Sequence, residues 1–182
     1  MKFEGELIYG EKNGKGKEYD NDGNLIFDGQ YFKGVKFIGR IKEYSYNGDI
    51  LFEGEYLNGK RNGKEYNYDG KLIFEGEYLK GERNGKGKEF YINDNLRYEG
   101  TYLNGKKWNG KGYNIMGNIE YEIIYGKGYI KEYNKYGELI FEGEYLNGER
   151  NEKGKERKFP KYGQELHYPG MPDSFLLDDS FN

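Results

Sequence analysis

The sequence predicts an all-β protein, an elongated, twisted, single-layer antiparallel meander of about seven β-hairpin repeats with a non-repeat C-terminal tail. Three observations lead to this fold class. A block of the type Phe-Glu-Gly-Glu-Tyr-Leu-Asn-Gly recurs along the chain. Apolar and charged residues alternate within the block, which is the period of a strand. The 182 residues include 30 Gly, 21 Tyr and no Ala, and this composition disfavours helices.

The repeat divides residues 3–166 into seven units. Close copies of the block begin at four positions, and looser copies begin at three more. The seven units start at Phe3, Phe27, Phe52, Phe74, Tyr98, Tyr121 and Phe141. Self-similarity at a fixed period of this length is typical of solenoids and other repeat arrays, in which each unit contacts only its neighbours. The remaining residues, 167–182, do not repeat and are expected to form a separate tail.

Each unit is expected to form one hairpin. In the fourth unit, residues 74–78 alternate between apolar and acidic side chains and predict the first strand. Residues 80–85 are rich in turn formers, and residues 86–91 resume an extended pattern. A second turn signal with Asn-Gly, Asp-Gly or Tyr-Gly separates successive units. It occurs at residues 21–24, 46–49, 68–71 and 135–138.

The alternation also predicts which side chains share a face. The Phe, Gly and Tyr of the first strand lie on one face, and the two Glu lie on the other. In the second strand, Gly85 and Gly87 are expected to share one face and Lys86 and Lys88 the opposite one. Rings from a neighbouring unit are then expected to cover the bare glycine backbone. The Glu pair is expected to face the Lys pair across the hairpin.

The charge distribution disfavours nucleic acid as a ligand. Residues 1–159 contain 28 Lys and Arg and 28 Asp and Glu, so the whole net charge of -3 arises after residue 159. A nucleic-acid surface needs a basic excess, which the repeats do not have. The balanced charges are better explained by a solvated ladder of Glu and Lys.

The residue inventory also argues against catalysis. His167 is the only histidine, and there is no Cys. Paired carboxylates such as Glu53 and Glu55 recur in several units, which favours a structural role over an active site. We therefore expect no enzyme activity, no cofactor and no metal site. The absence of a signal peptide and of any long apolar run leads us to expect a cytoplasmic protein.

Residues 105–130 break the repeat and are a candidate binding region. Trp108, the only Trp, is inserted beside Lys106 and Lys107, and five Ile are concentrated in this stretch. A repacked local core explains the region best, whereas a partner-binding hot spot is the functional alternative. Trp beside Lys would also suit a membrane interface. The partner-binding candidates are Trp108, Lys106, Lys107, Tyr56, Tyr78, Tyr102 and Tyr145.

The tail is the second irregular region. All three Pro lie in residues 160–172, and an acidic apolar segment follows at residues 173–181. We expect this tail to fold back as a cap on the last hairpin, because terminal repeats need one. A docking peptide for another protein is the alternative. The side chains for either role are Phe175, Leu176, Leu177 and Phe181.

The pattern of Tyr/Phe-Glu-Gly-Glu-Tyr, Asn-Gly, Gly-Lys-Gly and Asp/Asn-Gly resembles the MORN repeat (membrane occupation and recognition nexus) over residues 3 to about 166. The Tyr-rich variant is similar to copies in AT-rich protists and in bacterial proteins, some described as antitoxins. The resemblance implies strings of β-hairpins that act as non-enzymatic protein-interaction scaffolds. Two alternatives are an inhibitor or antitoxin that occludes an enzyme, and a peripheral binder of anionic lipid. The expected partner is another protein, and self-association is possible.

Overall fold

A computed structural model describes residues 1–152 and 154–156 of the chain, and every regular element in them is a β-strand. The near-absence of helix that the sequence predicts is confirmed for these residues, and none of them lies in a helix able to cross a membrane. The predicted tail, with Phe175, Leu176, Leu177 and Phe181, lies outside the described residues, as does the predicted repeat boundary at residue 166.

The strands form two sheets. The larger sheet has eleven strands in sequence order. They are β1 (Lys2–Ile8), β2 (Glu11–Tyr19), β3 (Leu25–Phe32), β4 (Val35–Tyr44), β5 (Ile50–Leu57), β6 (Lys60–Tyr66), β7 (Leu72–Leu79), β8 (Glu82–Phe90), β9 (Leu96–Leu103), β10 (Lys106–Tyr113) and β11 (Ile119–Ile123). The smaller sheet contains β12 (Gly128–Tyr133), β13 (Leu139–Leu146), β14 (Glu149–Arg150) and β15 (Lys155–Glu156).

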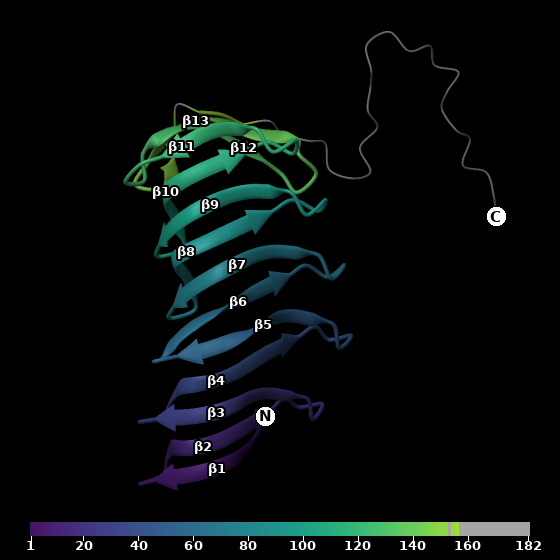
Figure 1. The fold of residues 1–182 in the computed structure, drawn as a ribbon, viewed down its shortest axis with the longest axis vertical. Helices are drawn as coiled ribbons and strands as arrows, with labels where there is room; N and C mark the ends of the chain where they lie inside the picture. The colour runs from purple at the N-terminus through teal and green to yellow at the C-terminus, as the bar shows by residue number, and fades with distance from the viewer. Residues whose placement is uncertain (153, 157–182) are drawn as a thin grey trace, which may run out of the picture.

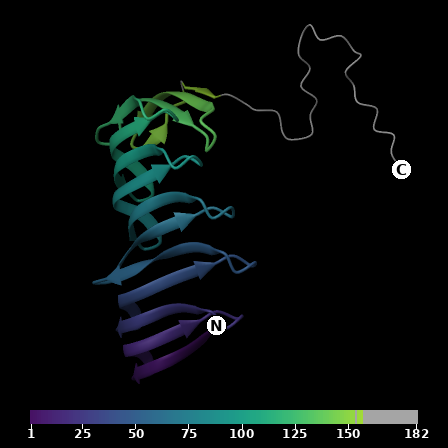
Figure 2. The ribbon, with the colours of Figure 1, turned by 45° about the vertical axis from the view of Figure 1, so that its right-hand side comes forward.

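The architecture is the predicted open antiparallel meander. Consecutive hairpins are stacked along the long axis, with β1 at one end and β13 at the other (Figures 1 and 2). The predicted single sheet is interrupted once, between β11 and β12, where only Ile124 and Lys127 form an isolated bridge. Elsewhere the two strands of a hairpin approach each other at a pair of facing glycines, such as Gly76 and Gly87.

Two isoleucines explain the interruption. By strand register, Ile123 pairs with Gly110 as Gly100 pairs with Gly87, and Ile130 pairs with Gly143 as Gly87 pairs with Gly100, so both isoleucines stand at central glycine positions of the neighbouring units. A Cβ added at Gly76 would lie 2.7 Å from the Cα of Gly87, so a side chain here prevents the close approach of the strands. Both isoleucines are instead buried in the core, at 1% exposure each. The β11–β12 pair therefore splays apart.

Tight turns set the hairpin register. In each unit, the two turn residues both have positive φ, as in Asn58-Gly59 (51° and 74°) and Lys80-Gly81 (53° and 87°), which is the geometry of a type I′ turn. The turn of the fourth unit is thus Lys80-Gly81 alone, and residues 82–85, predicted as part of the turn, already belong to β8. The turns between units are closed by the preceding polar residue; for example, the Asn67 side chain accepts N–H bonds from Asp69 and Lys71.

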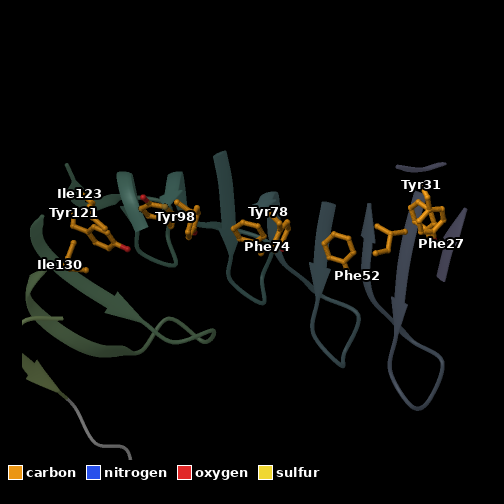
Figure 3. Close-up of a cluster of buried hydrophobic side chains, with 11 residues drawn as sticks. Phe27, Tyr31, Phe52, Phe74, Tyr78, Tyr98, Tyr121, Ile123 and Ile130 are labelled. Atoms are coloured by element: carbon orange, nitrogen blue, oxygen red, sulfur yellow. The ribbon is translucent and has the colours of Figure 1, made fainter. Parts of the chain in front are cut away.

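The core is a single row of aromatic rings along one face of the larger sheet (Figure 3). The centroid of the Phe74 ring lies 5.5 Å from that of Tyr78 in its own unit and 5.4 Å from that of Tyr102 in the next unit, and both pairs are edge-to-face. Both Phe74 and Tyr102 cover the backbone of Gly87, which confirms that rings lie over bare glycine. The covering ring therefore comes from the same unit as well as from the neighbour.

The predicted face of Gly85 is wrong. Gly85 has φ +96° at an irregularity in the β7–β8 register, and a Cβ there would meet the carboxylate of Glu77 on the opposite face from the rings. The first Glu of each pair does face a Lys, as Glu75 faces Lys88. The second Glu, Glu77, lies at the irregularity of the β7–β8 register and has no register partner in β8. Only one Glu of the predicted Glu pair therefore faces a Lys across this hairpin.

Replacing Gly76 with Val is expected to lower the free energy of unfolding by about 1–3 kcal/mol, because the added side chain overlaps Phe74 and the facing strand. The matched control is Glu75→Val, which places the same side chain at an exposed position of the same strand. Urea unfolding of both variants measures the difference. Equal midpoints for Gly76→Val and wild type would show that the rings do not need the bare backbone.

Candidate binding surfaces

The ring face of the sheet also carries a row of carboxylates that the sequence analysis missed. Each is a second-strand Glu that follows Lys, and each is ion-paired with at least one Lys or Arg. We call this row the glutamate ladder; it consists of Glu18, Glu43, Glu65, Glu89, Glu132 and Glu156. The sequence could have predicted this position of Glu89, because side chains alternate along a strand and Glu89, two residues after Gly87, shares its face.

The cations of the ladder connect neighbouring units. Arg83 binds Glu65 of the preceding unit at 2.7 Å and Glu89 of its own unit at 3.0 Å. Arg150 does the same with Glu132 at 2.9 Å and Glu156 at 2.7 Å. The guanidinium of Arg83 also lies 3.9 Å from the centroid of the Phe74 ring. Each such cation therefore covers the aromatic core and joins two hairpins.

Glu89 is the most buried member of the ladder. Its side chain is 5% exposed and contacts three cations: Lys107 at 2.8 Å, Arg97 at 3.0 Å and Arg83 at 3.0 Å. Burial alone would raise the pKa of Glu89, but the attraction of Lys107, Arg97 and Arg83 outweighs it and lowers this pKa to about 2. Glu89 is thus a permanently charged centre at ordinary pH.

The ladder has one gap, in the fifth unit. Gly112 stands at the register position that Glu89 holds in the fourth unit, since Gly112 pairs with Tyr121 as Glu89 pairs with Tyr98. The ring of Tyr121 fills the space above Gly112 so closely that a Cβ would overlap it. The ladder of the described residues therefore has no carboxylate between Glu89 and Glu132.

A pocket of about 370 Å³ lies beside this gap, where the two sheets diverge. We call it the junction pocket; strands β8 to β13 contribute to its wall. Six tyrosines line it: Tyr91, Tyr102, Tyr113, Tyr121, Tyr133 and Tyr145. Its charged lining consists of Glu89, Arg97, Lys106, Lys107, Lys131 and Glu132. Four cations and two carboxylates make this lining net positive.

Trp108 lies at a bulge of β10 next to the junction pocket. The β9–β10 register shifts between Lys107 and Asn109, which leaves Trp108 as the extra residue. Its carbonyl accepts the N–H of Gly126 at 2.8 Å, and its ring lies against the same glycine. Half-buried, Trp108 packs on the turn of the next hairpin, and its role in partner binding stays a prediction.

The other predicted partner-binding residues differ in how exposed they are. Lys107 is bound to Glu89, whereas Lys106 is more exposed and pairs with Glu149 at 2.7 Å. Tyr78 and Tyr102 belong to the core, at 5% and 4% exposure, and leave little surface for a partner. The half-buried residues Tyr56 and Tyr145 pack against the same core.

The face opposite the rings carries an exposed apolar row that the sequence analysis did not single out. One apolar residue precedes the tight turn of each of the seven hairpins and is 40 to 58% exposed. This outer apolar row consists of Ile8, Phe32, Leu57, Leu79, Leu103, Ile124 and Leu146. The sequence could have predicted this row from the alternation along the strand, since Leu79 follows the buried Tyr78 and must face outward.

Comparison with protein families identifies the repeat. Four segments match the family model of the MORN repeat: residues 3–25, 52–64, 74–95 and 141–158. These segments are MORN repeats. The MORN matches omit the stretch 96–140, which contains the Trp108 bulge, the gap at Gly112 and the splayed β11–β12 hairpin. No curated protein matches the chain. MORN repeats are commonly protein- or membrane-interaction scaffolds, and their family is typically non-enzymatic.

Proposed function

We propose that this MORN-repeat chain is a non-enzymatic scaffold that binds another protein along its outer face. The outer apolar row carries the proposal. Its seven side chains recur once per hairpin, at intervals of about 10 Å for two strands. A regular row of exposed apolar side chains that alternate with charged ones offers repeated contacts to a protein partner. Leu57 and Leu79 are bordered across the turn by Lys60 and Glu82.

The same face gives less support to lipid binding. Anionic membranes attract clusters of Lys and Arg. Here Glu and Lys alternate across neighbouring strands; for example, Glu53 pairs in register with both Lys42 and Lys64. Such a surface has no basic excess. An inhibitor or antitoxin would use the same apolar row, but would bind one partner in a fixed ratio.

Introducing charge into the row is expected to abolish partner binding. Leu57→Glu with Leu79→Glu removes two apolar contacts, each worth about 1.5–3 kcal/mol when buried, so the affinity should fall at least about tenfold. Both residues are exposed, so the free energy of unfolding should change little. Affinity purification from the native host, with quantitative mass spectrometry, compares the variant with wild type.

The matched control is Lys42→Glu with Lys86→Glu, which adds the same two carboxylates to exposed positions on the same face. The control should retain the partners. Equal capture by the row variant would contradict the proposal. A single partner in a fixed ratio would favour the inhibitor, and salt-sensitive pelleting with anionic vesicles would favour lipid binding.

A further inference from the structure

The junction pocket presents exposed positive charge. Lys107 and Arg97 are engaged by Glu89, Lys106 by Glu149 and Lys131 by Glu120, but the side chains of Lys131 and Lys106 remain 38% and 43% exposed. Lys131 lies 3.4 Å from the carboxylate of Glu120, and its ammonium group can donate a hydrogen bond to a second carboxylate. The pocket therefore presents two accessible ammonium groups beside a wall of tyrosine rings.

A buried hydroxyl in the pocket also lacks a hydrogen-bond partner. Tyr102 is 4% exposed, and no hydrogen bond to its hydroxyl is present among the described residues. A buried polar group without a partner costs free energy, which an incoming acceptor would recover. Ammonium groups, a free hydroxyl and aromatic walls together favour a ligand that combines carboxylates with apolar side chains.

One segment of this chain has that chemistry. Residues 173–181 contain Asp173, Asp178 and Asp179, two Phe, two Leu and no Lys or Arg. The residues after position 159 hold the whole net charge of -3, so the charges of the two surfaces are complementary. No other segment of similar length combines these features.

The chain can reach the pocket. Its last described strand, β15, ends at Glu156 and pairs with β13, and β13 contributes Tyr145 to the pocket wall. Residues 157–172 connect Glu156 to the acidic segment, and 16 extended residues span up to about 55 Å. This length is ample for a return to a pocket on the adjacent strand.

We propose that residues 173–181 occupy the junction pocket of the same chain. The aspartates pair with Lys106 and Lys131, and Phe175 and Leu176 pack on the tyrosine rings. The segment thereby fills the divergence between the two sheets, where the β11 and β12 edges are otherwise unpaired beyond Ile124 and Lys127. This proposal does not depend on the side chains of the outer apolar row.

Zero-length cross-linking of the full chain tests the contact. A carbodiimide joins an amine to a carboxylate only when the two touch. We expect links from Lys106 or Lys131 to Asp173, Asp178 or Asp179 in monomeric protein. The link from Lys106 to Glu149, which are 2.7 Å apart, is the internal reference. Formation of the reference without any link to the aspartates overturns the proposal, and so do aspartate links found only in dimers.

A second measurement uses charge reversal in the full chain. Lys106→Glu with Lys131→Glu should speed proteolytic cleavage within residues 160–182 by about tenfold, since the two ion pairs with the aspartates are lost. Lys15→Glu with Lys17→Glu, at the far end of the sheet, is the matched control and should leave the rate unchanged. Equal cleavage of both variants and wild type would place the segment elsewhere.

Discussion

Replacing Glu89 with Gln is expected to lower the free energy of unfolding by about 3–5 kcal/mol. The Glu89 carboxylate is the common partner of Arg83, Arg97 and Lys107, all within 3.0 Å. The neutral amide would leave Arg97 and Lys107 without their carboxylate partner and Arg83 with Glu65 alone, which is the costly way to break a buried ion pair. Denaturant unfolding monitored by Trp108 fluorescence measures the loss.

The pH dependence of stability provides an independent signature of the same group. The pKa of Glu89 falls from an ordinary 4.5 to about 2 in the folded chain. Because the folded pKa is the lower one, the stabilisation is complete above about pH 4.5 and is lost as the pH falls toward 2. The shift corresponds to about 3 kcal/mol, and the Gln variant should lack this part of the acid destabilisation.

Glu43→Gln is the matched control. Glu43 occupies the same ladder position, but its side chain is 49% exposed and has one partner, Arg61 at 2.9 Å. Exposed pairs contribute at most about 1 kcal/mol, so the control should lose far less stability than Glu89→Gln. Equal losses at the two positions would show that burial of the Glu89 cluster is not what stabilises the fold.

Restoring the repeat consensus at Gly112 is expected to destabilise the protein by about 3 kcal/mol, the upper end of the usual cost of overpacking. Gly112→Glu places a carboxylate at the missing position of the glutamate ladder, where consensus reasoning would expect a gain. The Tyr121 ring already occupies that space, so the new side chain must displace it or remain strained. Thermal unfolding of the variant measures the effect.

Two further variants make the Gly112 prediction specific. Lys111→Gln introduces a side chain of the same length as Glu at the exposed neighbouring position and should change stability by less than about 0.5 kcal/mol. Tyr121→Ala combined with Gly112→Glu removes the obstructing ring and should unfold at a higher temperature than Gly112→Glu alone. A stabilising effect of Gly112→Glu would mean that the ladder tolerates a carboxylate in every unit.

The hairpins could be predicted from the sequence because their signals are local. Alternation around Phe74 and the turn that begins at Lys80 depend only on adjacent residues, and the structure confirms both. The covering of Gly87 by rings also followed, because a strand glycine invites close approach. The observed start of β8 differs from the predicted one, because residues 82–85 belong to the strand and not to the turn. The positive φ of Gly85 also changes the face on which this residue lies.

The binding surfaces were less predictable because they depend on register between units. Glu89 looked like a surface charge until the register placed Arg83 and Lys107 beside it. Tyr78 and Tyr102 looked like partner contacts, but neighbouring hairpins bury them. The interruption at Ile123 follows from a side chain meeting a facing strand, which becomes visible only once the central glycines are aligned.

The single bridge between β11 and β12 has a mechanical consequence. The strands run across the long axis, so a pull along that axis loads the inter-strand hydrogen bonds along their own direction. Each hairpin is then peeled from its neighbour, and the applied force concentrates on the interface with the fewest bonds. That interface joins Ile124 to Lys127. Tension between the ends of the described chain would therefore separate β12 from β11 first. The eleven-stranded sheet would then unfold one hairpin at a time.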